Sequence, residues 1–265
     1  ARRVNVPSGT PSSFPLVEGD YLRRATAEFV GTFALIFVGA GAIMTAGGIH
    51  DPSLIGIAVA HGLVIGVMAS AVGHISGGHF NPAVTLAFVV TRRMKLSLAG
   101  VYWVTQFGAA TLGALLLKWI YPASAVDGAK LGVPALNGSI SSGAGLVVEA
   151  VLTFFLVWVI FATAADPRGA FKQISGLAIG FTITLDILIG GPLTGAAMNP
   201  ARAFGPQLVQ NAWSDGWIWY VGPIAGGVVA GVLYELLYLH PPRPEPVGVA
   251  SSGPDEPAPA EAALS

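Results

Sequence analysis

Six long stretches of apolar residues, separated by short polar segments, dominate the pattern along the chain. A helix needs about 20 consecutive apolar residues to cross the hydrocarbon core of a bilayer, and each of the six is near that length. We therefore predict an all-α membrane protein with six membrane-spanning helices, at residues 24–46, 53–72, 96–121, 145–164, 175–191 and 216–239.

Two further apolar segments, at residues 79–90 and 198–209, are too short to cross a bilayer. Both contain the tripeptide Asn-Pro-Ala, at Asn81, Pro82, Ala83 and at Asn199, Pro200, Ala201. Asparagine is a favoured N-cap and proline is favoured at the first helical position, so each tripeptide predicts the start of a helix. A short helix at membrane depth indicates a re-entrant half-helix, whose non-helical lead-in must be buried in protein or line a water-filled cavity.

The two halves of the chain resemble each other at a nearly constant offset. Glu28 begins the segment EFVGT and Glu149 begins EAVLT, while 118 residues (199 − 81) separate Asn81 from Asn199. Each half contains three predicted spans, and because three is odd the second half crosses the membrane in the opposite sense. The repeat is therefore inverted, and the amino-terminal ends of the two half-helices should meet near the midplane.

Inversion would place Asn81 and Asn199 back to back, each with a side-chain amide available to a permeating molecule. The positive ends of both helix dipoles would point at the same place. A cation there meets two positive ends, whereas a neutral solute that forms hydrogen bonds does not.

Composition agrees with a membrane protein and disfavours other classes. Only 10% of the residues are charged, against about 25% in soluble domains, and the mean hydropathy is +0.68. The net charge of −1 gives no basic face for nucleic acid. The chain has no Cys, its five His are scattered, and no Ser-His-Asp order or phosphate-binding loop occurs. We expect no enzyme activity, no cofactor, no metal and no nucleic-acid partner.

The positions of Lys and Arg predict the orientation. Ten of the 13 fall on one face if both termini are cytoplasmic. We expect an integral multi-pass protein of a cell membrane rather than of an internal membrane. Its membrane domain should comprise residues 21–240, with repeats at 21–121 and 143–240, between disordered tails at 1–20 and 241–265.

Six spans in an inverted repeat with two Asn-Pro-Ala half-helices resemble the major intrinsic protein family, which includes aquaporins and aquaglyceroporins. The resemblance covers about residues 21–239 and includes the segments AEFVGTF, SGGHFNPAVT, MNPARAFGP and YVGP. It implies the aquaporin fold and a homotetramer with one pore in each subunit. It also implies that Asn81 and Asn199 form a central pair that hydrogen-bonds the permeating molecule.

The resemblance implies a selectivity filter near the outer mouth of the pore. Arg202 matches the filter arginine of the family. Counting back from the two Asn-Pro-Ala motifs gives the other members as His61, Ile187 and Ala196. This set is similar to the filter of plant tonoplast intrinsic proteins. Glycerol facilitators have Trp in place of His61 and usually Asp in place of Ala203.

Five further polar residues in the predicted spans or beside them need partners. Glu28 and Glu149 occupy equivalent positions, and we expect each to accept hydrogen bonds from the backbone that leads into a half-helix. An acid–base role for the two carboxylates is the less favoured alternative. His74 and Gln106 should support the same scaffold or line the inner pore. Asp186 has no assigned partner, and if it faced the lumen the filter assignment would be wrong.

These features predict a passive channel that conducts water in single file and excludes protons and ions. Hydrogen peroxide, ammonia and urea are further candidate solutes. Two alternatives stay open: a facilitator of glycerol or other small polyols, and a structural or junctional membrane protein with a closed pore. The expected partners are water, small neutral solutes, the lipid bilayer and further copies of the chain.

Overall fold

The structure is a computed structural model that describes residues 20–46, 53–169 and 174–239. Six helices in these ranges are long and apolar enough to cross a membrane, as the sequence predicted. They are formed by α1–η2–α2 (Tyr21–Ala34, Leu35–Ala40, Gly41–Ala46), α3 (Leu54–Ser76), α5 (Leu96–Ile120), α7–η4 (Ser142–Ile160, Phe161–Ala165), α8 (Ser175–Thr194) and α10–η6 (Ile218–Tyr234, Glu235–Leu239). The tails expected at 1–20 and 241–265 lie, apart from residue 20, outside the described residues.

One half-helix completes each half of the bundle. The predicted half-helices are α4 (Pro82–Val90) and α9 (Pro200–Gln210), and both begin at the proline of the Asn-Pro-Ala tripeptide. The connection after α5 contains α6 (Ala123–Ala129) and the 3-10 turn η3 (Lys130–Gly132).

One helix end differs from its predicted position, because the span predicted to end at residue 72 continues to Ser76. The first half-helix begins at Pro82 with Asn81 as its N-cap, as the Asn-Pro pair predicts. Three spans also contain π-helical stretches, η2, η4 and η6. A continuous apolar run has no periodicity that distinguishes an α-helix from a π-helix, so these stretches left no signal in the sequence.

Close packing of α3 against α8 forms the centre of the bundle. A Cβ atom added to Gly62 would lie 2.4 Å from the carbonyl oxygen of Gly180, and a Cβ on Gly180 would lie 2.4 Å from that of Gly62. The two backbones can approach this closely only because neither residue has a side chain, as is common between membrane helices. This contact sets the separation of two helices that border the central cavity described below.

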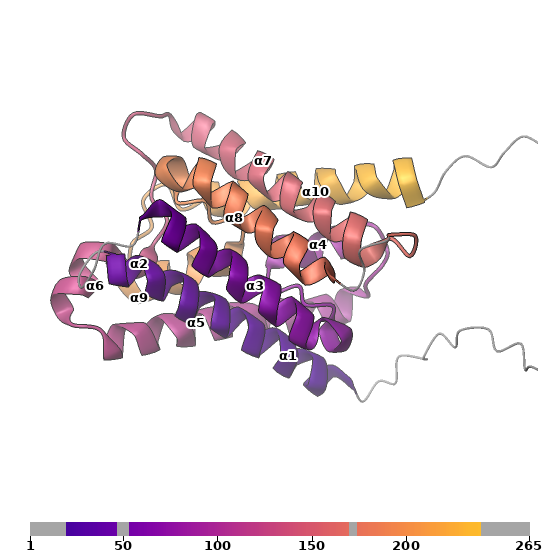
Figure 1. The fold of residues 1–265 in the computed structure, drawn as a ribbon, viewed down its shortest axis with the longest axis horizontal. Helices are drawn as coiled ribbons and strands as arrows, with labels where there is room; N and C mark the ends of the chain where they lie inside the picture. The colour runs from indigo at the N-terminus through magenta and orange to yellow at the C-terminus, as the bar shows by residue number, and fades with distance from the viewer. Residues whose placement is uncertain (1–19, 47–52, 170–173, 240–265) are drawn as a thin grey trace, which may run out of the picture.

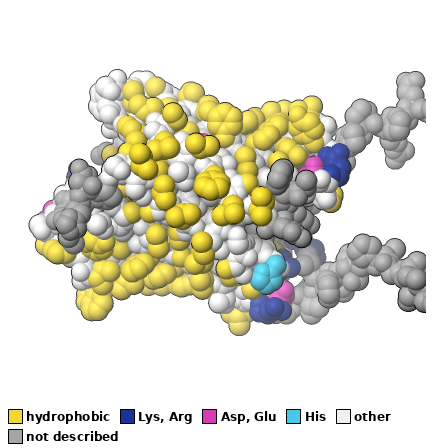
Figure 2. Space-filling model, in the orientation of Figure 1, with side chains coloured by type: hydrophobic (Ala, Val, Ile, Leu, Met, Phe, Trp, Pro, Cys, Tyr) yellow, Lys and Arg dark blue, Asp and Glu magenta, His cyan; other side chains and the backbone are white. Residues whose placement is uncertain are grey.

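The outer surface fits a lipid environment. Large apolar side chains are exposed along the spans, with Val104 77% and Ile189 69% accessible. Figure 2 shows a hydrophobic middle, with charged side chains gathered at one end of this face. At that same end α1 begins and α10 finishes, while α6 lies at the opposite end (Figure 1). The protein is therefore an integral multi-pass membrane protein.

A candidate pore and its selectivity filter

The amino-terminal ends of α4 and α9 meet inside the bundle and are linked crosswise. Asn81 caps α4 through its Oδ1, which accepts a hydrogen bond from the Ala83 amide at 2.9 Å. Its Nδ2 donates to the carbonyl of Met198 at 2.8 Å, in the lead-in of the other half-helix. Asn199 in turn donates from Nδ2 to the carbonyl of Phe80 at 2.8 Å. One hydrogen of each amide is therefore used, and the second is left for a molecule in the pore.

Glu28 holds the lead-in to α4. Its buried carboxyl group accepts hydrogen bonds from the Ser76 hydroxyl at 2.7 Å and from the His79 amide at 2.9 Å. It also accepts from the Phe80 amide at 2.7 Å and from Nε2 of Gln106 at 2.9 Å. Phe80 has a left-handed backbone with φ of 48°, a conformation that costs about 1–3 kcal/mol at a non-glycine residue. The four hydrogen bonds stabilise this conformation.

Glu149 holds the lead-in to α9 in the same manner. It accepts from the Thr194 hydroxyl at 2.6 Å, from the Ala197 amide at 3.0 Å and from the Met198 amide at 2.7 Å. The residues Ala196 and Met198 again have positive φ, at 43° and 52°. The inverted repeat therefore extends to individual hydrogen bonds.

The two scaffolds differ in one donor. An aromatic donor is common to both: the hydroxyl of Tyr102 donates to the carbonyl of Ser76 at 2.6 Å, and its repeat partner Trp219 donates to the carbonyl of Thr194 at 3.0 Å. The residue in the second half that corresponds to Gln106 is a proline, which has no side-chain amide. Glu149 thus has three hydrogen-bond donors where Glu28 has four.

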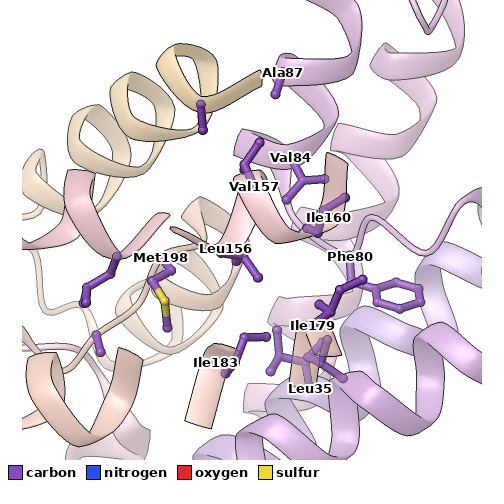
Figure 3. Packing of buried hydrophobic residues seen from close by; sticks show 14 of the residues in the cluster. Leu35, Phe80, Val84, Ala87, Leu156, Val157, Ile160, Ile179, Ile183 and Met198 are labelled. Carbon is purple, nitrogen blue, oxygen red and sulfur yellow. The ribbon is translucent and has the colours of Figure 1, made fainter. Parts of the chain in front are cut away.

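One cavity in the middle of the molecule brings the predicted pore residues together. Its lining includes Asn81, Asn199, His61, Ile187, Ala196 and Arg202. Apolar side chains form most of the remaining wall, among them Leu35, Leu156, Ile179 and Ile183 (Figure 3). A molecule in this cavity would meet a few polar groups separated by apolar surface.

The polar filter side chains are oriented by backbone contacts. Nη1 of Arg202 donates to the carbonyl of Gly132 at 2.7 Å, and the buried Nε of the same residue has no partner among the described residues. Nδ1 of His61 lies 2.9 Å from the carbonyl of Ile57 and donates to it. A neutral imidazole then keeps Nε2 as an acceptor. Gly39 makes room for this ring, because a Cβ there would lie 2.6 Å from Nε2 of His61.

Asp186 is buried, with 6% of its surface accessible. It does not line the central cavity, and its Oδ2 has no hydrogen-bond partner in the described part of the chain. The arrangement that would have overturned the filter assignment is therefore not present. The physical reason is helical geometry, since adjacent residues on a helix, here Asp186 and Ile187, point about 100° apart.

Of the two roles expected for His74, support of the scaffold is wrong and lining of the inner end of the pore agrees with the structure, whereas Gln106 lies in the scaffold. His74 is exposed and lines a wider cavity at one end of the pore rather than a half-helix lead-in. Gln106 donates to Glu28 and, at 3.1 Å, to the Thr85 hydroxyl. Sequence reasoning missed Thr85 and Ser76. The correspondence of Ser76 with Thr194 in the repeat was the signal that could have found one of them.

Comparison with known proteins identifies the family. The family model for major intrinsic proteins matches residues 16–234, and the chain belongs to the major intrinsic protein family. It is a channel protein and not an enzyme. Within the described ranges, no group of three or more His, Cys, Asp or Glu could hold a metal ion.

Several relatives are similar over most of their length. The chain is 41% identical over 233 residues to aquaporin TIP4-4 of Zea mays. The aligned region covers 84% of this chain and 91% of the relative. It is 40% identical over 221 residues to aquaporin-4 of Mus musculus, covering 82% and 68% of the two chains. The solved aquaglyceroporin from Plasmodium falciparum superposes with a TM-score of 0.76 at 24% identity, over 82% of this chain and 96% of that one. This last similarity concerns the fold alone.

Proposed function

We propose that the protein is a passive water channel, with residues 21–240 as the channel domain. The observation that carries the proposal is the single cavity bordered by both asparagines and by all four filter residues. Its polar groups suit water: Asn81 and Asn199 each keep one N–H, Arg202 keeps its Nε, and His61 offers an acceptor. The apolar walls between them leave water few other partners, which favours passage in single file.

Exclusion of cations and protons follows from the same geometry. The positive ends of α4 and α9 meet at the asparagines, and the guanidinium of Arg202 borders the cavity. Fixed positive potential inside a pore raises the energy of a cation but not that of neutral water.

The glycerol alternative has less support. The superposition on an aquaglyceroporin carries no information on the solute, whereas the names of the relatives at about 40% identity include aquaporin TIP4-4 and aquaporin-4. His61 and Ala203 also differ from the residues of glycerol facilitators. Hydrogen peroxide, ammonia and urea stay as candidate solutes beside water.

We further propose a homotetramer with one pore in each subunit and both termini in the cytoplasm. Light scattering of the detergent-solubilised protein tests the tetramer, and protease access to tagged termini in intact cells tests the orientation. The expected cell-membrane location stays a prediction. The similarity to aquaporin TIP4-4 does not favour it, because the TIP relatives are tonoplast aquaporins. Fluorescence imaging of the tagged protein in its source cells tests it.

Osmotic shrinkage of reconstituted vesicles tests the proposed function. We expect water flux well above that of empty vesicles, with weak temperature dependence and with slow glycerol uptake in a parallel assay. Protein that elutes as a single folded species but leaves water flux at the level of empty vesicles would refute the water channel. Glycerol uptake as fast as water flux would favour the polyol facilitator instead.

A further inference from the structure

A second cavity lies at the end of the bundle where α1 begins. Four cationic side chains line it together with one acidic residue: Arg24, Arg92, Arg93, Lys95 and Asp20. We call this cavity the inner vestibule. It is formed by the start of α1, the end of α3 and the connection between α4 and α5, which contributes three of the four cations.

The inner vestibule leads to the pore. His79 lines both the vestibule and the central cavity that contains the asparagines and the filter. The side chain of His79 is held at this junction, 3.1 Å from the Thr85 hydroxyl and against the ring of Phe88. A molecule that enters the pore from this face therefore passes the cationic side chains first.

Two of these cations have counter-ions among the described residues and two do not. Nε of Arg24 lies 3.4 Å from a carboxylate oxygen of Asp20, and Nη2 of Arg93 donates to Glu235 at 3.0 Å. Arg92 and Lys95 are exposed, and neither side chain has a hydrogen bond or an ion pair with the described residues. Counted over the described residues, the vestibule thus has an excess of two positive charges beside the pore entrance.

The general preference for cations on the cytoplasmic side accounts for the sign of these charges but not for their position. That preference is satisfied by Lys and Arg anywhere near the membrane interface. Here the cations share one cavity, and guanidinium and ammonium groups in such a cavity are suited to phosphate oxygens.

We propose that the inner vestibule binds an anion that carries phosphate groups with two or more negative charges, and that the bound anion obstructs water entry. The obstruction rests on the proposed water-channel function, whereas the binding does not. Arg92 and Lys95 supply the uncompensated charge. The anion stays in the vestibule because the cavity beyond His79 is narrow and has largely apolar walls. Its source is either a soluble polyphosphate or the headgroup of an anionic lipid.

One double variant and one control isolate the site. Arg92 has a left-handed backbone with φ of 59°, so Arg92→Asn removes the charge with a residue that tolerates this conformation. It is combined with Lys95→Gln. The matched control is Lys130→Asn, because Lys130 is also cationic with φ of 47° but lies in η3, at the opposite end of the bundle.

Binding and flux are measured separately. Titration calorimetry with inorganic tripolyphosphate on the detergent-solubilised protein should show binding, and the affinity should fall at least about tenfold in the double variant and not in Lys130→Asn. In zwitterionic vesicles, tripolyphosphate on the vestibule side should lower water flux toward that of empty vesicles, and on the other side it should have no effect. Flux lowered by cardiolipin in the membrane, a lipid whose headgroup carries two phosphates, without tripolyphosphate, would assign the lipid as a source.

Two results would overturn the proposal: no binding of tripolyphosphate together with no inhibition by either phosphate source, or equal affinity in the wild type and the double variant. Binding without inhibition would overturn the obstruction. A chain that conducts no water before any anion is added would instead refute the proposed function, and calorimetry would still test the site.

Discussion

The substitution Glu149→Gln tests whether one buried carboxyl group holds the filter in place. In the wild type this group accepts hydrogen bonds from Thr194, Ala197 and Met198. An amide of the same size has one oxygen and one NH2 group, so at least one of the three donors must face another donor. The lead-in around Ala196 would then lose at least one of the hydrogen bonds that stabilise its left-handed backbone.

The magnitude follows from the number of hydrogen bonds. A hydrogen bond to a charged group contributes about 1.5–3 kcal/mol, and a buried donor left without a partner costs about 1–3 kcal/mol. Loss of one bond with one unpaired donor therefore predicts a destabilisation of about 2.5–6 kcal/mol. Because Ala196 and Arg202 flank the affected segment, we expect water flux per protein to fall several-fold as well.

Thermal unfolding of the purified protein and water flux in vesicles measure the two effects. The control is Asp186→Asn, which changes another buried acid whose Oδ2 has no hydrogen-bond partner in the described residues. We expect this control to change stability by less than about 1 kcal/mol and to leave flux near the wild-type value. If Glu149→Gln behaved like the control, the scaffold role of Glu149 would be wrong.

Three further predictions concern the filter and the end of the bundle where α10 finishes. Gly39→Ala should displace the His61 ring, since the added Cβ would lie 2.6 Å from Nε2. We expect water flux to change several-fold, and unchanged flux would show that the ring position does not matter. Arg202→Ala should allow cation leakage, measured as current across a planar bilayer, because the cation bordering the cavity is lost; no current in a conducting variant would contradict this. Hydrogen bonds from Arg168 hold the pKa of Asp166 below its usual range, so their stabilisation is present above about pH 3.9 and is lost as pH falls further. The difference in melting temperature between the wild type and Asp166→Asn should therefore be constant from neutral pH to about pH 4 and shrink below it; a difference that grew on acidification would exclude this pair as its source.

Spans and half-helices were predictable because their signals are local. An apolar run of sufficient length has to be a helix in a bilayer, since only a helix satisfies all of its backbone groups within one segment. The Asn-Pro start of each half-helix is equally local, because capping depends on the asparagine and on the amides that immediately follow it. The inverted repeat needed only the count of three spans in each half.

The positions of single side chains between helices were less predictable. Nothing near His74 in the sequence indicates that it stays exposed while Ser76, two residues later, donates to Glu28. The need for glycine at position 39 likewise depends on a ring from α3, 22 residues further along the chain (61 − 39).

The sequence by itself determined the membrane class, the number of spans, the two half-helices and the pairing of Glu28 with Glu149 across the repeat. Only the tertiary structure decided that each asparagine donates to the lead-in of the opposite half-helix and that Asp186 lies off the central cavity. It also placed uncompensated cations beside the pore entrance. The physical reason is that composition and helix capping act within a few residues, whereas these contacts join segments that meet only once the two halves have packed together.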